Sequence, residues 1–517
     1  MQDQSQYLVL SFALSSLPPP PLPSSSRSLF LCPPSLIQLI HSMPHLPMLK
    51  NIPFDLPELC GPISKHLRVG DLVRCVLVCR TWNTYFSPWL WNTIFLNYGQ
   101  HRDPGIEVTT KNRRYIKNLG FNGIVNKAFA ALTYPNVSSL YLGHNRNIST
   151  DPLSAASCLV SLKLEHVRVQ KPRAFWTAVS KLPGIRQLQL KGLYLEHEAL
   201  EPFWNVCTQL ENLQVSQGSM DASLAKSRDF RRMTSLAILN VAGIQAKDAS
   251  EWFIKCPNLK ELWIRPLLGA PGGTVLFPST ASLPNSGAWP LLEVLRLDDR
   301  PITDDDLSKL ISNMSRKPRV IRVGGSDFAK LSFEILKPLF GGLQRLDLPY
   351  VVKTRNSARI VHTILCYNPQ LQVLNACRIK AIDLLQEHEP WVCGRSLRLL
   401  KIHFEFPMND DDKADFQRPI FKRLATLRAL EELDVTGRYR LENKSDEDAL
   451  DFRLKSGLGE LATLKHLRSV SFERTRQQLE DEDVAWIAKH WQGLRTLRGL
   501  WNEDPTTLRR LQGILRF

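Results

Sequence analysis

The sequence predicts an α/β protein in which a small all-helical module is followed by a long, curved solenoid of repeated strand and helix units. Three observations carry this prediction: a compact helical pattern at residues 53–97, an apolar motif that recurs from residue 135 onward, and helical periodicity between its copies. With 43% hydrophobic and 22% charged residues, the 517-residue chain has enough apolar surface to bury a core. A wholly disordered chain is therefore excluded.

Residues 1–52 are predicted to form a disordered leader. The first fifty residues contain nine prolines and ten serines, a composition that opposes a packed core. The apolar run from Tyr7 to Leu17 lacks a positively charged N-terminal region and is too short to span a bilayer. We expect no membrane association here, and Met43 is an alternative start of translation that would leave residues 1–42 untranslated.

Residues 53–97 are predicted to form a three-helix module. Pro57 suits the first turn of the first helix, whereas Pro62 removes a backbone hydrogen bond within it. A second helix is expected to begin at Asp71, whose carboxylate can cap it. The apolar face of the first helix comprises Leu56, Leu59, Ile63 and Leu67, and the buried side of the second comprises Leu72, Cys75, Val76 and Cys79.

The rest of the chain repeats one pattern: an apolar residue, two variable residues, an apolar residue, one variable residue and a final apolar residue. From Leu140 to Leu262, with Leu239 taken as one centre, successive central residues lie 22, 26, 25, 26 and 23 positions apart. This is the leucine-rich-repeat period. A single unit cannot bury its own apolar face, so neighbouring units are expected to stack with strands on the concave face and helices on the convex face. Well-formed copies occupy residues 159–164, 185–190, 210–215, 236–241, 259–264, 292–297, 343–348, 397–402 and 430–435.

The connections between copies are predicted to be helical at residues 174–179, 199–204, 248–253 and 304–311, where apolar residues lie three and four apart. The solenoid is expected to span residues 135–517, with residues 98–134 as a linker or cap. Loop insertions are predicted near 267–289 and 405–420, the second containing an acidic run at 409–415. The glycines of the first lack the Gly-Lys-Ser/Thr ending of a phosphate-binding loop.

The net charge of +16 is spread along the chain, with an excess of six positive charges in residues 53–150 and nine in the residues after 150. A dedicated nucleic-acid domain concentrates such residues on one face, so the charge does not favour nucleic acid. Ten scattered cysteines indicate a reducing compartment, and no pair has zinc-site spacing. We therefore expect neither a metal nor any other cofactor.

A set of positions between residues 56 and 91 follows a recognisable order. Its members are Leu56, Pro57, Glu58, Ile63, Leu67, Asp71, Leu72, Cys75, Val78, Arg80, Trp82, Leu90 and Trp91. This order resembles an F-box, and residues 75–82 resemble the version found in fungal F-box proteins. The repeats resemble the cysteine-containing leucine-rich-repeat subtype, because Cys207 and Cys256 precede their strands. Gly61-Pro62 departs from the F-box pattern, which puts the strength of docking in doubt.

The resemblance implies a non-catalytic substrate receptor of an SCF-type (Skp-cullin-F-box) ubiquitin ligase in the cytoplasm or nucleus. In this family the F-box binds a Skp-type adaptor, and through it a cullin-RING ligase, while the repeats hold the protein to be ubiquitinated. Transferred to this sequence, the adaptor contacts would be Leu56, Pro57, Ile63, Leu67, Leu72, Val78 and Trp82.

Substrate specificity is expected on strand side chains that point away from the core. These lie between the two final apolar residues of each repeat, and one of them is Asn240. Their mixed charge argues against a track for a phosphate backbone. Because aromatic and arginine side chains dominate binding hot spots, the predicted substrate contacts are Tyr141, Trp263 and Arg296, with Lys163 ranked after them.

Two other classes of function compete with this one. A protein-binding scaffold could use the same modules without delivering substrates for ubiquitination. An enzyme is disfavoured, because the sequence lacks a nucleophile elbow, a His-Glu-x-x-His motif and a nucleotide-binding glycine pattern. The sequence identifies neither the substrate nor any modification or small molecule needed to recruit it.

Overall fold

A computed structural model describes residues 57–97, 104–123, 127–144, 148, 150, 153, 156–265, 287–298, 302–314, 317–324, 328–348, 357–386, 388–406, 410–436, 449–475 and 477–515. The predicted leader and Leu56 lie outside these residues. The chain divides into two units at residue 67, and the described part of the first unit is residues 57–67.

The first unit contains helix α2 (Pro57–Ser64). The helix begins at Pro57, as predicted, and continues through Pro62. It ends at Ser64, whose hydroxyl donates a 2.5 Å hydrogen bond to the carbonyl of Cys60. The helix therefore stops before Leu67, the last member of the predicted apolar face.

The second unit begins with helices α3 (Val69–Val78) and α4 (Arg80–Leu90). The predicted start of the second helix at Asp71 is wrong by two residues, because α3 begins at Val69 and Asp71 lies in its first turn. The carboxylate of Asp71 pairs instead with Arg74 at 3.2 Å. Cys79 is also misplaced in the prediction: it is exposed between the helices, where its sulfur accepts a 3.4 Å hydrogen bond from the amide of Trp82.

The described residues of the second unit contain one parallel sheet whose sixteen strands follow each other in chain order. The sheet begins at Thr93, well before residue 135, where the solenoid was predicted to begin. Its first strand, β1, lies at the end of the predicted helical module, and it pairs with β2, which lies in the predicted linker. The strands are β1 (Thr93–Asn97), β2 (Asn118–Asn122), β3 (Ser139–Gly143), β4 (Ser161–Glu165), β5 (Gln187–Lys191), β6 (Asn212–Ser216), β7 (Ser235–Leu239), β8 (Glu261–Arg265), β9 (Val294–Leu297), β10 (Val320–Val323), β11 (Arg345–Asp347), β12 (Val373–Lys380), β13 (Leu399–Glu405), β14 (Glu432–Asp434), β15 (Ser469–Ser471) and β16 (Thr496–Arg498).

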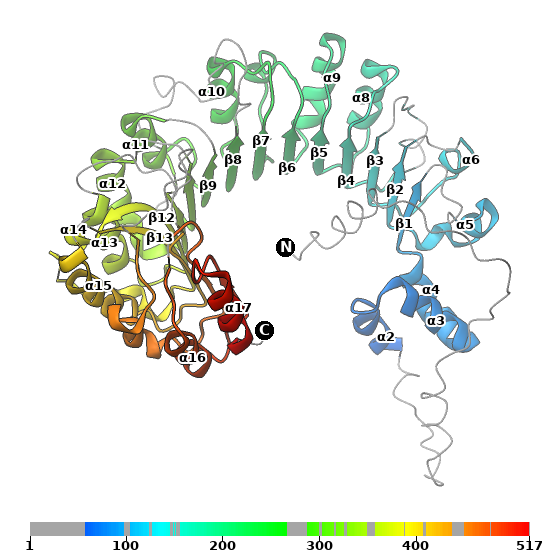
Figure 1. Cartoon of the computed structure of the whole chain (residues 1–517). Coiled ribbons are helices and arrows are strands. Elements are labelled where there is room, and N and C mark those ends of the chain that lie inside the picture. The colour runs from blue at the N-terminus through cyan, green and yellow to red at the C-terminus, as the bar shows by residue number, and fades with distance from the viewer. Residues whose placement is uncertain are drawn as a thin grey trace, which may run out of the picture. The chain divides into compact units, whose positions relative to one another are not determined.

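Helices connect most of the strands, and Figure 1 shows α8, α9 and α10 along the same side of the sheet. The four predicted helical connections are confirmed by α8, α9, α10 and α11. Short 3-10 segments take this role at 113–115, 225–227, 337–342, 392–395, 454–456 and 458–463. The helices are α5 (Ile106–Asn112), α6 (Lys127–Ala130), α8 (Pro172–Ser180), α9 (His197–Cys207), α10 (Ala246–Ile254), α11 (Asp304–Ser312), α12 (Lys330–Leu336), α13 (Ser357–Tyr367), α14 (Ala381–Leu385), α15 (Asp410–Leu424), α16 (Asp481–His490) and α17 (Pro505–Ile514).

Both predicted insertions need correction. The acidic run expected on a loop instead begins helix α15 at Asp410, as the positive end of a helix dipole allows. The other insertion was expected to reach residue 289, but Trp289 is fully buried and its indole N–H donates a 2.9 Å hydrogen bond to the carbonyl of Phe253. Residues 266–286 lie outside the described part of the chain.

The core lies between the strands and the helices. Strand leucines such as Leu140, Leu142, Leu162 and Leu164 are fully buried, while the residues between them face the opposite side of the sheet. We call this opposite side the open face. Adjacent aromatic pairs in α8, α9 and α10 form a continuous series of ring contacts, which includes the 4.8 Å packing of Trp204 on Trp252. Such burial supplies most of the stability of a stacked repeat.

The strand register corrects one predicted open-face residue. Leu236 pairs with Leu213 and Leu262, so the centre of this repeat is Leu236 and the open-face residue is Ala237. The sequence 233–241 fits the apolar pattern in two phases, at 233–238 and at 236–241, and the prediction took the second, centred on Leu239. Asn240 instead adopts a left-handed turn with φ 55°, and its amide bonds to the carbonyl of Arg265 at 2.7 Å.

Candidate binding surfaces

Helix α2 carries part of the predicted adaptor contact. Pro57 is exposed, and Ile63 and Leu67 are partly buried. Leu59, which was expected on the buried face of the helix, has 42% of its surface exposed. These positions leave apolar surface on α2 accessible, and the contact itself stays a prediction.

Helix α3 presents a stripe of exposed apolar side chains on a single face. Val69, Val73 and Leu77 lie four residues apart, with exposed fractions of 68%, 40% and 77%. Leu72, on another face, is only 6% exposed, so its side chain serves the interior rather than a partner. A helix that is apolar on two faces has one more apolar face than its own core requires, and such exposed apolar surface is typical of interaction sites.

The other two predicted adaptor contacts lie at the ends of α3 and α4. Val78 is 62% exposed at the last residue of α3. Trp82, in the first turn of α4, is partly buried and packs on Phe86 with ring centroids 5.4 Å apart. The exposed stripe on α3 was missed by sequence reasoning, although its four-residue spacing could have indicated it.

The four predicted substrate contacts all lie on the open face, as two separate pairs. Tyr141 on β3 is the register partner of Lys163 on β4, and Trp263 on β8 is the register partner of Arg296 on β9. Three strands separate β4 from β8, which at about 4.8 Å per strand puts the pairs roughly 20 Å apart. The structure therefore provides two candidate subsites, and their role in binding stays a prediction.

In the first pair the basic residue shares a carboxylate, that of Glu165, with a second lysine. The Glu165 carboxylate accepts hydrogen bonds from Lys191 at 2.6 Å and from the Tyr141 hydroxyl at 3.3 Å. Lys163 lies 3.7 Å from the same carboxylate, and its ammonium is 5.3 Å from the centre of the Tyr141 ring. Burial, together with the nearby charge and hydrogen bond of Glu165, raises the pKa of Tyr141 to about 12.

An aromatic surface adjoins this first pair. Phe95 on β1 is 55% exposed, and its ring lies 6.0 Å from that of Tyr141. The residue between them is Gly120 on β2, where a Cβ atom would overlap the Phe95 ring. Glycine at this position therefore gives the Phe95 ring room beside Tyr141. Phe95 was not among the predicted contacts, because β1 lies before the first recognisable repeat.

In the second pair a buried carboxylate organises the surrounding cations. Asp298 directly follows β9 and is 2% exposed. Its Oδ2 accepts hydrogen bonds from the indole of Trp263 at 2.8 Å and from Arg265 at 3.0 Å, and Arg322 pairs with its Oδ1 at 2.7 Å. The guanidinium of Arg296 lies 5.4 Å from the centre of the Trp263 ring. Asp298, Arg265 and Arg322 were missed, because their partners lie 24 to 35 residues away in the sequence.

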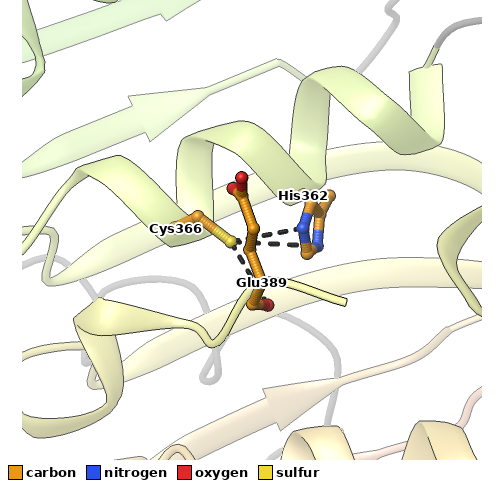
Figure 2. A group of neighbouring side chains, drawn as sticks. All are labelled: His362, Cys366 and Glu389. Atoms are coloured by element: carbon orange, nitrogen blue, oxygen red, sulfur yellow. Dashed lines mark hydrogen bonds between the residues drawn. The ribbon is translucent and has the colours of Figure 1, made fainter. Parts of the chain in front are cut away.

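A third group brings together three potential metal ligands, His362 and Cys366 on α13 and Glu389 after α14 (Figure 2). Potential ligand atoms of His362, Cys366 and Glu389 lie within 4.8 Å of one another. However, the Trp391 indole donates to His362 Nδ1 at 3.3 Å, and the Arg423 guanidinium lies 3.2 Å from the same atom. These donors require an unprotonated Nδ1, which leaves the imidazole proton on Nε2, 3.3 Å from the Cys366 sulfur. The lone pair that a metal would need is thereby occupied, so the buried His362 and Cys366 fit a hydrogen-bond network and not a metal site.

Among the helices in the described residues, none combines the length and the apolar character needed to cross a membrane. The membrane question for the first fifty-six residues lies outside the described part of the chain.

Comparison with known proteins locates the first module. A family model described as F-box-like matches residues 57–97, the segment that contains α2, α3, α4 and β1. F-box/LRR-repeat protein 4 of Bos taurus is 25% identical over 296 residues, which cover 52% of this chain and 45% of that protein. The match thus spans less than half the length of the relative.

Two solved structures show a loose likeness. A chain of a TLR13–ssRNA13 complex has a TM-score of 0.42 at 15% identity, covering 75% of this chain and 56% of that one. A leucine-rich-repeat protein of Leptospira interrogans has a TM-score of 0.40 at 13% identity, covering 82% and 98%. At these scores the fold class rests on the parallel sheet of the chain itself. The chain therefore carries an F-box-like segment followed by leucine-rich repeats, and in this organisation it is similar to F-box/LRR-repeat proteins.

Proposed function

We propose that this protein is a substrate receptor of an SCF-type ubiquitin ligase. The observation that carries the proposal is the F-box-like match at residues 57–97, within which α3 exposes the apolar stripe of Val69, Val73 and Leu77. An F-box implies a Skp-type adaptor as the partner, and through it a cullin-RING ligase. The repeats that follow supply a long open face for a second protein.

The proposed role is non-catalytic. Holding a substrate close to an activated ubiquitin raises the effective concentration of the substrate's lysine side chains, as linking two binding modules does. The substrate contacts proposed on the open face are Tyr141, Lys163, Trp263 and Arg296. Such a role goes with an intracellular location, in the cytoplasm or the nucleus.

Co-purification of a Skp-type adaptor and a cullin with the full chain tests the proposal. We expect Val73→Asp with Leu77→Asp to abolish recovery of both proteins, because each substitution places a charge on the proposed apolar contact. Leu331→Asp is the matched control, since this residue of α12 is also an exposed apolar side chain, 52% exposed. Thermal unfolding of each variant checks that the fold is retained.

Two outcomes would count against the proposal. If the unmodified chain recovers neither adaptor nor cullin, the alternative of a protein-binding scaffold without a ligase role is favoured. If the double variant recovers as much adaptor as the unmodified chain, the α3 stripe is not the contact. Leu56→Ala with Pro57→Ala then tests whether the start of α2 supplies it.

A further inference from the structure

The open face carries a group of cations at β8, β9 and β10 that differs from the rest of the sheet. Trp263, Arg296 and Arg322 are register partners on three adjacent strands, so their side chains stand side by side. Arg265 lies at the end of β8 and reaches the same carboxylate, that of Asp298. We call these five residues the arginine cluster.

The buried Asp298 fixes the geometry of the arginine cluster. Its two carboxylate oxygens contact the Trp263 indole and the guanidinium groups of Arg265 and Arg322. The side chain of Arg265 is 34% exposed and that of Arg322 is 40% exposed. A charged group that is 2% exposed is stable only when it is paired, so these contacts are strongly favoured. The surrounding side chains are therefore held in place before any ligand arrives.

Arg296 is the arginine of the cluster for which the described residues provide no counter-ion. Its guanidinium lies over the Trp263 ring, and no carboxylate among the described residues pairs with it. Three guanidinium groups and one carboxylate leave an excess of two positive charges among these four side chains. Arginine presents a planar fork of N–H donors that matches an oxyanion and can donate two hydrogen bonds to it.

We propose that the arginine cluster is a docking site for an oxyanion on an acidic segment of the bound protein, either a carboxylate or a phosphorylated side chain. Arg296 binds the oxyanion, Arg265 and Arg322 supply the surrounding positive potential, and Trp263 offers an aromatic face to the neighbouring residue of the segment. This inference rests on the proposed function in one respect, that the open face is where the substrate protein binds.

Fluorescence anisotropy of the full chain with three labelled degenerate peptide libraries tests the proposal. The libraries differ only at a fixed central pair of residues, which is Asp/Glu, phosphoserine or Asn/Gln. We expect binding of one or both charged libraries and none of the neutral one. Arg296→Gln should weaken that binding about three- to tenfold and Arg296→Lys less, because lysine retains the charge but not the fork.

Lys401→Gln is the matched control. It removes one positive charge from the same face of the sheet at β13, where Asp434 already pairs with the lysine at 2.8 Å, and should change binding less than twofold. The library that binds distinguishes a carboxylate from a phosphate. Equal losses for the two glutamine variants, no loss for either, or no binding by any library would overturn the proposal. So would a single-stranded oligouridylate that binds more tightly than the peptides and depends on Arg296.

The same preparations separate this inference from the proposed function. Arg296→Gln should leave recovery of the Skp-type adaptor unchanged, because Arg296 lies on β9 and the proposed adaptor contacts lie at residues 56–82. Adaptor recovery without a preference for charged libraries defeats only the arginine cluster. A charge preference without adaptor recovery defeats only the ligase role.

Discussion

The two aromatic and cationic pairs on the open face have the same sequence pattern and opposite electrostatics. In each, an aromatic residue on one strand is the register partner of a basic residue on the next. In the first pair the neighbouring carboxylate, Glu165, contacts the basic residue itself. In the second, Asp298 engages the aromatic side chain and two flanking arginines, so the stacked Arg296 keeps its charge available. The position of one carboxylate thus decides whether it contacts the basic residue of the pair, as Glu165 does, or the aromatic residue, as Asp298 does.

The largest expected difference between the two pairs is in the loss of stability when the carboxylate of Asp298 or of Glu165 is replaced. Asp298→Asn should lower the free energy of unfolding by about 2–3 kcal/mol, because it removes the charge of a carboxylate that is only 2% exposed and that contacts Trp263, Arg265 and Arg322. Glu165→Gln should cost about 1 kcal/mol, because the Glu165 carboxylate is more accessible, at 15%, and its partner Lys191 can be solvated. Urea denaturation of both variants measures the two values. Equal costs would contradict the distinction between a buried and a half-exposed network.

Replacing the aromatic residue should also destabilise the second pair more than the first, but the difference should be smaller than for the carboxylates. Trp263→Phe removes the indole N–H that donates to Asp298 at 2.8 Å and should cost about 1–2 kcal/mol, since the acceptor is a charged group. Tyr141→Phe removes a 3.3 Å bond to Glu165 and should cost about 0.5 kcal/mol or less. Denaturation midpoints provide the comparison, and a larger loss for Tyr141→Phe would reverse the ranking.

Alkaline titration sharpens the description of the first pair. The pKa of Tyr141 is raised from 10.0 to about 12, so the folded state favours the neutral phenol. The resulting stabilisation is fully present below pH 10 and is lost as the pH rises from 10 to 12. In Glu165→Gln this pKa should fall, while remaining above 10 because burial is the largest cause. NMR of ¹³Cζ-labelled tyrosine, assigned with Tyr141→Phe, measures it; an unchanged pKa would show that Glu165 has no influence.

The smallest expected effect is at acid pH. Burial opposes ionisation of Glu165, but the hydrogen bond and charge of Lys191, the charge of Lys163 and the hydrogen bond of Tyr141 outweigh it, so the pKa lies below its ordinary 4.5. The corresponding stabilisation is present above about pH 4.5 and disappears as the pH falls through the lowered pKa. Lys191→Met should remove most of this pH dependence, which amounts to less than about 1 kcal/mol in the free energy of unfolding. Stability measured between pH 3 and 6 tests it, with Arg296→Gln as a variant expected to retain the dependence.

The repeat architecture could be predicted because each strand places its leucines in the core at a constant spacing, and burial enforces that spacing. The error at Asn240 arose where two phases fit equally well, and only pairing with the neighbouring strands decides between them. The open-face position of Trp263 and Arg296 followed from the same alternation. The role of Asp298 did not, because its burial and its three partners depend on strands that come together only in the folded sheet.

The exposed face of α3 has a consequence for how the protein exists in solution. Val69, Val73 and Leu77 form an apolar stripe that the described residues of the helix's own unit leave exposed to water. An isolated copy can lower its free energy by pairing this stripe with another molecule, so the free chain is expected to self-associate as its concentration rises. A dedicated partner would compete with that reaction, and the yield of monodisperse protein would then depend on how much partner is produced with it.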